Sequence, residues 1–371
     1  MHMPKKIVAV IMEGGSPAHP VTRALATVRA AVVLDTIGRL HAVAGVESVV
    51  LATNYPALAA QASSLGALIH RPSGVFHFGR VLQEIVRDTG AEAILCLGGA
   101  AAPYLTAEEF RAIAEKLQAE PRVVLTNNPQ SADLTAFAPA DVIFSVEPPA
   151  EDNALATLLR DQAGLRCELL PHSLGVHFDL DTPTDALLMS LLPYNGANVT
   201  GALASLGWDT GRLRRALARL SETHCEMGLM GRVSPQTMAL LNSRSFVRLR
   251  VFSEERGMKA LGRVERGLVV SLMGYFLETV GPEAFFSFVS KTCDVCFIDT
   301  RVLFAHSKLK LSEAERFLSD LGRFDEIEHP YLRDFTRAAA ECAIPIILGG
   351  HSLVSGGMWA VVDLLDRLNP K

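Results

Sequence analysis

The sequence lacks most features that mark membrane, secreted or nucleic-acid-binding proteins. None of its apolar runs approaches the roughly 20 residues that span a bilayer. Six cysteines scattered over 371 residues do not make a disulfide framework. The net charge of −5 disfavours a protein that binds nucleic acid over its whole surface. We therefore expect a cytoplasmic protein with neither a membrane nor a nucleic acid as its partner.

Aromatic residues are also scarce, at 6% of the chain, although 49% of the residues are hydrophobic. The apolar content is mostly Ala, Leu and Val, which is typical of helices packed around a parallel sheet and not of a β-sandwich. A chain of this length exceeds what one core usually organises, so we expect two domains.

Between residues 6 and 140, short apolar runs alternate with helical patterns at 27–45 and 78–90. The runs are continuously apolar and end in turn residues, as buried strands of a parallel sheet do. They are IVAVIM, SVVLATN, AILCLGG and RVVLTNN. This order predicts an α/β domain with a doubly wound, mostly parallel sheet.

Two helix starts are well marked. Thr106 and Glu109 have the spacing of a capping box. Thr182 is placed as an N-cap, with Pro183 in the first turn and Asp185 three residues on. The helix that begins there is broken at 193–196, and we place the domain boundary at that break. The first domain then covers 1–193 and the second covers 194–371.

The second domain is predicted to be mostly helical, with helices in the stretch 197–290. A small α/β element ends it, with strand-like runs at 295–306 and 344–350 and helices between and after them.

Three segments of the first domain resemble a known superfamily. They are VIMEGGSPAHPVTR, a glycine-rich loop after the first strand; ILCLGGAAAPYLTAEEF, a strand followed by a proline and a capped helix; and FDLDTPTD, the most specific of the three. Together they resemble the GT-A-type nucleotidyltransferases that include molybdenum-cofactor guanylyltransferases, phospholactate guanylyltransferases and sugar-nucleotide pyrophosphorylases. The resemblance implies a nucleotide-diphospho-sugar transferase-like fold.

The resemblance also implies a reaction, in which an NMP passes from an NTP to a phosphorylated acceptor and pyrophosphate leaves. Glycines let backbone N–H groups approach phosphates, and a basic side chain neutralises charge on the transferred group. By the resemblance, the phosphate contacts are Gly14, Gly15, Ser16 and Arg23, and Asp181 holds Mg²⁺. Arg23 and Asp181 are then the catalytic residues. Gly79, in FHFG, lies where relatives form part of the nucleobase pocket.

Two positions depart from the superfamily. Ala101 stands where relatives have a magnesium-binding aspartate, and Glu13 places a negative charge beside the expected phosphates. Either Glu13 forms a displaced metal site with Asp179 or Asp181, or no metal binds. The plainer reading of Asp179, Asp181 and Asp185 is helix capping.

The second domain carries two further candidate groups, and no family resemblance covers it. Asp299, Arg301 and His306 are polar residues in an apolar run, so they either form a structural ion pair or face a cleft. His351 and Ser352 belong to GGHSLVSGG, where a strand, a glycine-rich loop and a helix follow one another as in anion-binding sites.

Three functions follow from these features. The first is nucleotidyl transfer to a phosphorylated acceptor. The second is a degenerate module that binds a nucleotide or a sugar phosphate without transfer. The third is an enzyme of another class that uses GGHSLVSGG. The expected partners are a nucleotide and a phosphorylated small molecule, and the sequence leaves a homodimer open.

Overall fold

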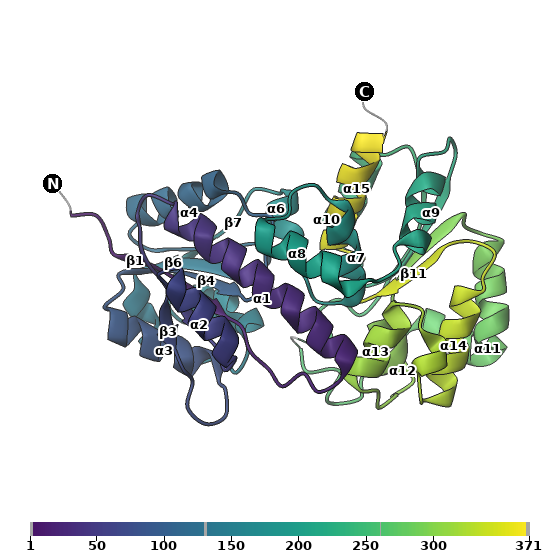
Figure 1. Cartoon of the computed structure of the whole chain (residues 1–371), viewed down its shortest axis with the longest axis horizontal. Coiled ribbons are helices and arrows are strands. Elements are labelled where there is room, and N and C mark those ends of the chain that lie inside the picture. The colour runs from purple at the N-terminus through teal and green to yellow at the C-terminus, as the bar shows by residue number, and fades with distance from the viewer. Residues whose placement is uncertain (1–2, 130–131, 260, 369–371) are drawn as a thin grey trace. The chain divides into compact units, whose positions relative to one another are not determined.

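The computed structural model describes residues 3–129, 132–259 and 261–368 (Figure 1). Its contacts divide the chain into two compact units. The first unit comprises Met1–Ser16, Thr27–Val176 and Gly196–Val199. The second comprises Pro17–Ala26, His177–Asn195 and Thr200–Lys371. Helix α1 (Pro20–His41) therefore contributes residues to both units.

The described part of the first unit contains a seven-stranded sheet in the order β3-β2-β1-β4-β6-β5-β7 (Figure 1). Only β6 runs antiparallel to its two neighbours. The strands are β1 (Ile7–Met12), β2 (Val46–Ala52), β3 (Leu68–His70), β4 (Ala93–Gly98), β5 (Val123–Thr126), β6 (Leu134–Ala138) and β7 (Arg166–Leu169).

Both faces of this sheet are buried. Alternate residues of β1 pack into two different cores: Ile7, Ala9 and Ile11 into one, and Val8, Val10 and Met12 into the other. Helices α1, α2 and α4 supply side chains to the first core, and α3 and α5 supply them to the second. The predicted doubly wound, mostly parallel α/β fold is confirmed.

The helices of this unit besides α1 are α2 (Pro56–Ser64), α3 (Phe78–Thr89), α4 (Ala107–Ala119), α5 (Leu155–Asp161) and α6 (Leu174–His177), the last of which ends at the start of the second unit. The sequence predicted β1, β2, β4 and β5 and gave no sign of the other three strands. Two of these, β3 and β7, lie at the edges of the sheet, where partial exposure removes the continuous apolar run of a buried strand.

The second unit also contains a sheet, with four parallel strands in the order β11-β10-β8-β9. Its strands are β8 (Glu226–Gly231), β9 (Arg248–Ser253), β10 (Val295–Asp299) and β11 (Ile346–Gly349). The last two strands were predicted. The first two lie in the stretch predicted to be helical, and that part of the prediction is wrong. Two of the six residues of β8 are glycines and two are methionines, while arginines alternate with apolar residues at the start of β9.

The rest of the second unit is rich in helices, as predicted. They are α7 (Pro183–Leu191), α8 (Ala197–Leu206), α9 (Gly211–Leu220), α10 (Pro235–Arg244), α11 (Leu272–Ser290), α12 (Thr300–His306), α13 (Glu313–Asp320), α14 (Pro330–Ala340) and α15 (Gly356–Leu368). The predicted strand at 295–306 is corrected, because it ends at Asp299. The Asp299 side chain accepts a hydrogen bond from the Arg301 N–H and starts α12, which places Arg301 and His306 on a helix.

The predicted capping box at Thr106 is confirmed: its hydroxyl accepts the Glu109 N–H, and the Glu109 carboxylate accepts the Thr106 N–H. The predicted N-cap at Thr182 is confirmed too, and Asp185, whose carboxylate accepts the Thr182 N–H, makes it a second capping box. The boundary at 193/194 stays a prediction. By their contacts, His177–Asn195 belong with the second unit and Gly196–Val199 with the first. Asp35 of α1 accepts hydrogen bonds from the Val199 N–H and the Asn198 side chain.

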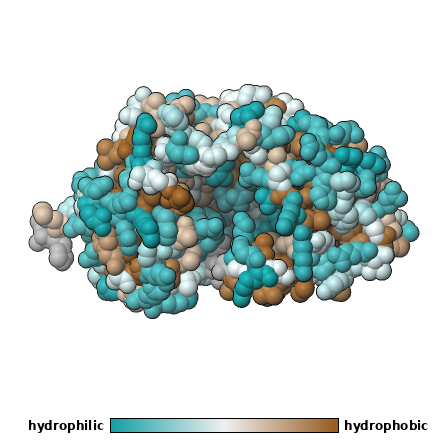
Figure 2. Space-filling model, turned by 90° about the horizontal axis from the view of Figure 1, so that it is seen from below, coloured by the Kyte–Doolittle hydropathy of each residue, from teal (hydrophilic) through white to brown (hydrophobic). Residues whose placement is uncertain are grey.

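No helix among the described residues is long and apolar enough to cross a membrane. On the face shown in Figure 2, hydrophilic side chains prevail and apolar ones form separate patches.

Two glycines of the second unit provide a matched test of its packing. At Gly356, a Cβ would lie 1.9 Å from the carbonyl oxygen of His177. At Gly201, inside α8, a Cβ would meet nothing within 4 Å. We expect Gly356→Ala to lower the free energy of unfolding by about 1–3 kcal/mol through overpacking. Gly201→Ala should raise it by about 0.5–1 kcal/mol. Urea unfolding of both variants measures this, and equal effects would contradict it.

Candidate functional site

The glycine-rich loop follows β1 and is exposed at Gly14, Gly15 and Ser16. Asn54, which follows β2, holds this loop: its Oδ1 accepts the Gly15 N–H at 3.0 Å and its Nδ2 donates to the Gly15 carbonyl at 2.8 Å. A Cβ on Gly14 would lie 2.6 Å from Asn54 Oδ1, so a side chain there would displace the amide that holds the loop. One of the N–H groups expected to meet a phosphate is therefore already bonded within the protein.

The two neighbouring N–H groups are differently placed. Among the described residues, those of Gly14 and Ser16 donate to no partner, and both residues are exposed. With the Ser16 hydroxyl, they leave three donors for an anion at the end of a central strand.

Glu13 lies between the glycine loop and β1, and it is buried. Arg29 of α1 holds the Glu13 carboxylate with two hydrogen bonds, Nε to Oε1 at 3.1 Å and Nη2 to Oε2 at 2.9 Å. The backbone after β4 approaches so closely that a Cβ on Gly99 would meet Glu13 Oε2 at 2.0 Å. In the sheet, β2 lies on one side of β1 and β4 lies on the other. The Glu13–Arg29 pair, at the end of β1, is therefore at the switch point of the sheet, where α/β proteins bind ligands.

This arrangement does not fit the magnesium site that the resemblance implies. Ala101, buried just after β4, offers no ligand atom. Both oxygens of Glu13 are already occupied by a guanidinium. Among the described residues, no group of three or more His, Cys, Asp or Glu side chains is arranged to hold a metal. Glu13 belongs to the first unit, whereas Asp179 and Asp181 belong to the second.

Two other residues of the expected nucleotide site have local structural roles. Gly79, at the start of α3, is buried, and a Cβ there would lie 2.7 Å from Pro149. Arg23 is exposed, belongs to the second unit, and donates to the carbonyl of Ala18 in its own loop. The roles of Gly79 and Arg23 at a nucleotide stay predictions.

The three aspartates of FDLDTPTD differ in environment. Asp181 is exposed, and Asp179 accepts a hydrogen bond from the Leu180 N–H. Asp185 is fully buried, and its Oδ2 accepts from the Thr182 N–H at 2.7 Å and from the Thr182 hydroxyl at 2.8 Å. Its Oδ1 has no hydrogen-bond partner among the described residues. Burial raises the pKa of Asp185 to about 7, against the effect of these hydrogen bonds.

The loop GGHSLVSGG packs against this motif. The buried Ser352 hydroxyl donates to Asp185 Oδ2 at 2.6 Å, and Thr184 donates to the Leu348 carbonyl. A Cβ on Gly350 would lie 2.9 Å from the Thr182 side chain. Close packing against Thr182 therefore explains the glycine at Gly350, and the bond to Asp185 explains the serine at Ser352. Ser352 is committed to Asp185, which does not favour it as a nucleophile.

The polar residues near the end of β10 are paired. Arg232, one residue beyond β8, forks onto Asp299, with Nε–Oδ2 at 2.6 Å and Nη2–Oδ1 at 3.1 Å. Burial alone would raise the pKa of Asp299, but the charge and hydrogen bonds of Arg232 outweigh it and lower the pKa. Arg301 forks in the same way onto Asp320 at the end of α13, at 2.7 and 2.6 Å. The sequence allowed an Asp299–Arg301 pair; each residue instead has another principal partner.

His306 joins two helices. Its Nδ1 accepts the Ser271 N–H at 3.1 Å, and the Tyr275 ring meets it edge-on with centroids 4.4 Å apart. A Cβ on Gly274 would lie 2.3 Å from the His306 ring, so α11 and α12 touch there. These contacts give His306 a packing role.

His351 is the loop residue that packing does not explain. It is half-buried, and its ring makes no hydrogen bond with the described residues. Burial, and then the charge of Arg232, lower the pKa of His351 to about 4, although Asp299 and Asp181 act in the opposite direction. At neutral pH the imidazole is uncharged and can both donate and accept a hydrogen bond.

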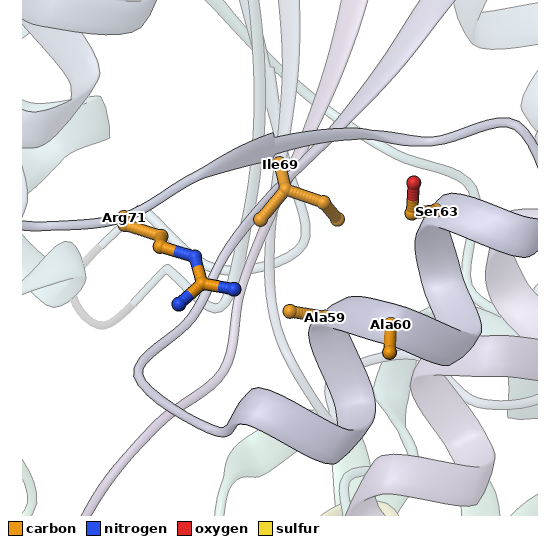
Figure 3. A pocket seen from close by; sticks show the side chains of 5 residues that line it. All are labelled: Ala59, Ala60, Ser63, Ile69 and Arg71. Atoms are coloured by element: carbon orange, nitrogen blue, oxygen red, sulfur yellow. The ribbon is translucent and has the colours of Figure 1, made fainter.

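The structure also identifies residues that the sequence did not bring forward. Arg232 was missed because β8, which positions it, was not predicted, and Asp320 and Asn54 lie on elements with no unusual composition. Arg29 is the next arginine after Arg23, but its pairing with Glu13 could not be read from spacing. A depression between α2 and β3, lined by Ala59, Ala60, Ser63, Ile69 and Arg71, contains none of the predicted site residues (Figure 3).

A scan with protein-family models finds no match, and a search of curated proteins finds none either. Solved structures do resemble the chain. A cytidylyltransferase from Leptospira borgpetersenii matches with a TM-score of 0.40 and 14% identity, over 55% of this chain and 94% of that one. A 4-diphosphocytidyl-2C-methyl-D-erythritol synthase matches with a TM-score of 0.39 and 16% identity, over 51% and 99%.

A CMP:2-keto-3-deoxy-manno-octonic acid synthetase in complex with CTP matches with a TM-score of 0.37 and 18% identity, over 50% of this chain and all of that one. These are nucleotidyltransferases of the nucleotide-diphospho-sugar transferase fold. Similarity at this level carries no conclusion about activity, and the fold class follows from the strand order itself.

The Glu13–Arg29 pair gives a stability prediction. Arg29→Met would leave a buried carboxylate without its cation, and we expect the free energy of unfolding to fall by about 2 kcal/mol or more, less than for a fully buried pair because Arg29 is partly exposed. Glu13→Gln combined with Arg29→Met should recover part of this loss. Urea unfolding measures all variants, and a double variant as unstable as the single one would contradict the pairing.

Asp185 gives a pH prediction. The unfolded chain loses this proton near 3.8 and the folded chain near 7, so between these values only the folded state holds it. Unfolding then releases a proton, and rising pH lowers the free energy of unfolding by up to about 1.4 kcal/mol per pH unit. Asp185→Asn lacks this titration, so its stability relative to the parent should rise from pH 4 to pH 7. Parallel stability curves in urea unfolding would contradict the assignment.

Proposed function

We propose that the first unit is a nucleotidyltransferase-like module that binds the phosphates of a nucleotide or a phosphorylated sugar without magnesium-dependent transfer. The finer resemblance, to molybdenum-cofactor guanylyltransferases and their relatives, belongs to this proposal. So do the partners, a nucleotide and a phosphorylated small molecule.

The glycine loop supports phosphate binding. The Gly14 and Ser16 N–H groups and the Ser16 hydroxyl are exposed beyond the end of β1, at the switch point of a sheet buried on both faces. Exposed backbone N–H groups of a glycine-rich turn bind phosphate oxygens directly.

The Glu13–Arg29 pair is the observation that supports binding without magnesium-dependent transfer. In the superfamily reaction, a divalent cation neutralises charge on the phosphates, and carboxylates hold that cation. Here the carboxylate nearest the loop is neutralised by Arg29, and Ala101 replaces the other ligand. A carboxylate already held by an arginine gains little from binding a second cation. The module is therefore proposed to bind and not to transfer.

Nucleotidyl transfer remains the alternative function that the same experiment tests. It requires a magnesium site, for which Asp179 and Asp181 remain the predicted ligands.

A charge reversal in the loop tests the proposal. Isothermal titration with ATP, GTP, CTP, UTP and sugar phosphates, first in EDTA and then in Mg²⁺, should give saturable binding in both. We expect Ser16→Glu to weaken that binding about tenfold or more, because it removes a donor and adds a negative charge. Ser64→Glu, at the exposed end of α2, makes the same charge change elsewhere on the unit and should leave the affinity unchanged.

Three outcomes count against the proposal. No binding by any of these compounds removes it altogether. If Ser16→Glu and Ser64→Glu weaken the affinity equally, the effect comes from the overall charge of the unit and not from the loop. Pyrophosphate release that requires Mg²⁺ and an acceptor establishes the transferase instead.

A further inference from the structure

The second sheet has a switch point of its own. Its order β11-β10-β8-β9 means that the chain leaves β8 toward β9 on one side and returns to β10 on the other. Ligands of parallel α/β sheets bind outside the carboxyl ends of strands at such a point. In this unit that point lies between Gly231–Arg232, which end β8, and Asp299, which ends β10.

The floor of this point is tightly built. Gly231 has a φ of +113°, and a Cβ there would lie 2.5 Å from the Asp299 side chain, so the two strand ends approach as closely as only glycine permits. Arg232 and Asp299 neutralise each other with the two hydrogen bonds described above. The Arg232 side chain is 10% exposed and that of Asp299 is fully buried. This pair is therefore a polar floor with no net charge.

Three other polar groups come to this edge from separate parts of the unit. His351 follows β11, Asp181 precedes α7, and Arg256 follows β9. Backbone contacts bring these segments together: Gly349, two residues before His351, pairs with Asp299, and a Cβ on Gly350 would lie 2.9 Å from Thr182, the residue after Asp181. The Glu254 N–H, two residues before Arg256, donates to the Gly231 carbonyl at the end of β8. Arg256 and Asp181 are exposed, and among the described residues neither side chain forms an ion pair.

We propose that this edge binds a small polar molecule whose anionic group pairs with Arg256 and whose hydroxyl group is held by His351 and Asp181. An arginine with no carboxylate partner favours a phosphate or a carboxylate. A neutral imidazole and a carboxylate are both able to accept the hydrogen bond of a hydroxyl. Arg232 and Asp299 bind each other, so we assign neither of them a contact with the ligand. The site is independent of the one proposed for the first unit.

The experiment follows the His351 ring by NMR with histidine-selective labelling, and His351→Gln assigns its resonance. Glycerol 3-phosphate, glycerate and glycerol are titrated separately. We expect a saturable shift of the His351 resonance with at least one of the two anions and none with glycerol. The tighter of the two anions identifies phosphate or carboxylate as the preferred group.

Two arginine variants show whether the response is local. Arg256→Glu should weaken the binding about tenfold or more. Arg215→Glu reverses the charge of another exposed arginine in the same unit, on α9, and should leave the affinity unchanged. Asp181→Ala removes the proposed acceptor of the hydroxyl group, so it should reduce any preference for glycerol 3-phosphate over inorganic phosphate, which is titrated in the same way.

The proposal fails if the His351 resonance shows no saturable shift with either anion, or if both arginine variants weaken binding equally. The variant Ser16→Glu, which tests the first unit, should leave the His351 response intact. The two proposals therefore fail separately.

Discussion

Both sheets are buried between helices, so charged groups at the strand ends must be paired within the protein. This constraint accounts for most of the polar structure. Glu13 at the end of β1 is held by Arg29, and Asp299 at the end of β10 is held by Arg232. Isolated charges at these depths would carry a large desolvation cost. Polar side chains at the strand ends that lie outside these pairs are the ones available to bind a ligand.

In the first unit, the same pairing of buried charges bears on whether a similar fold can have a similar function. The glycine loop follows β1 and the capped helix α4 follows β4, as the sequence predicted. Both oxygens of the Glu13 carboxylate in that loop accept hydrogen bonds from Arg29. A fold is maintained by packing, whereas a metal site depends on a few specific ligands, so the first can persist after the second has changed.

The sequence predicted what depends on local signals. Continuous apolar runs marked four of the strands in the first unit, and the Thr106 capping box and the Thr182 N-cap marked two helix starts. Partners distant in sequence could not be predicted. Asp185 and Ser352 are 167 positions apart, and nothing in either segment points to the other. Strand β8 was missed because its glycines and methionines carry little β-propensity, and Arg232 was missed with it.

Helix α1 belongs to both units, and this affects how the protein is made. All segments of the first unit have left the ribosome soon after Val199 is synthesised. The second unit needs Pro17–Ala26 from the beginning of the chain and β11 and α15 from its end. Domains generally fold as units during synthesis. The first unit can therefore fold while translation continues, whereas the second cannot be completed before β11 and α15 are made, although it includes about the first two turns of α1.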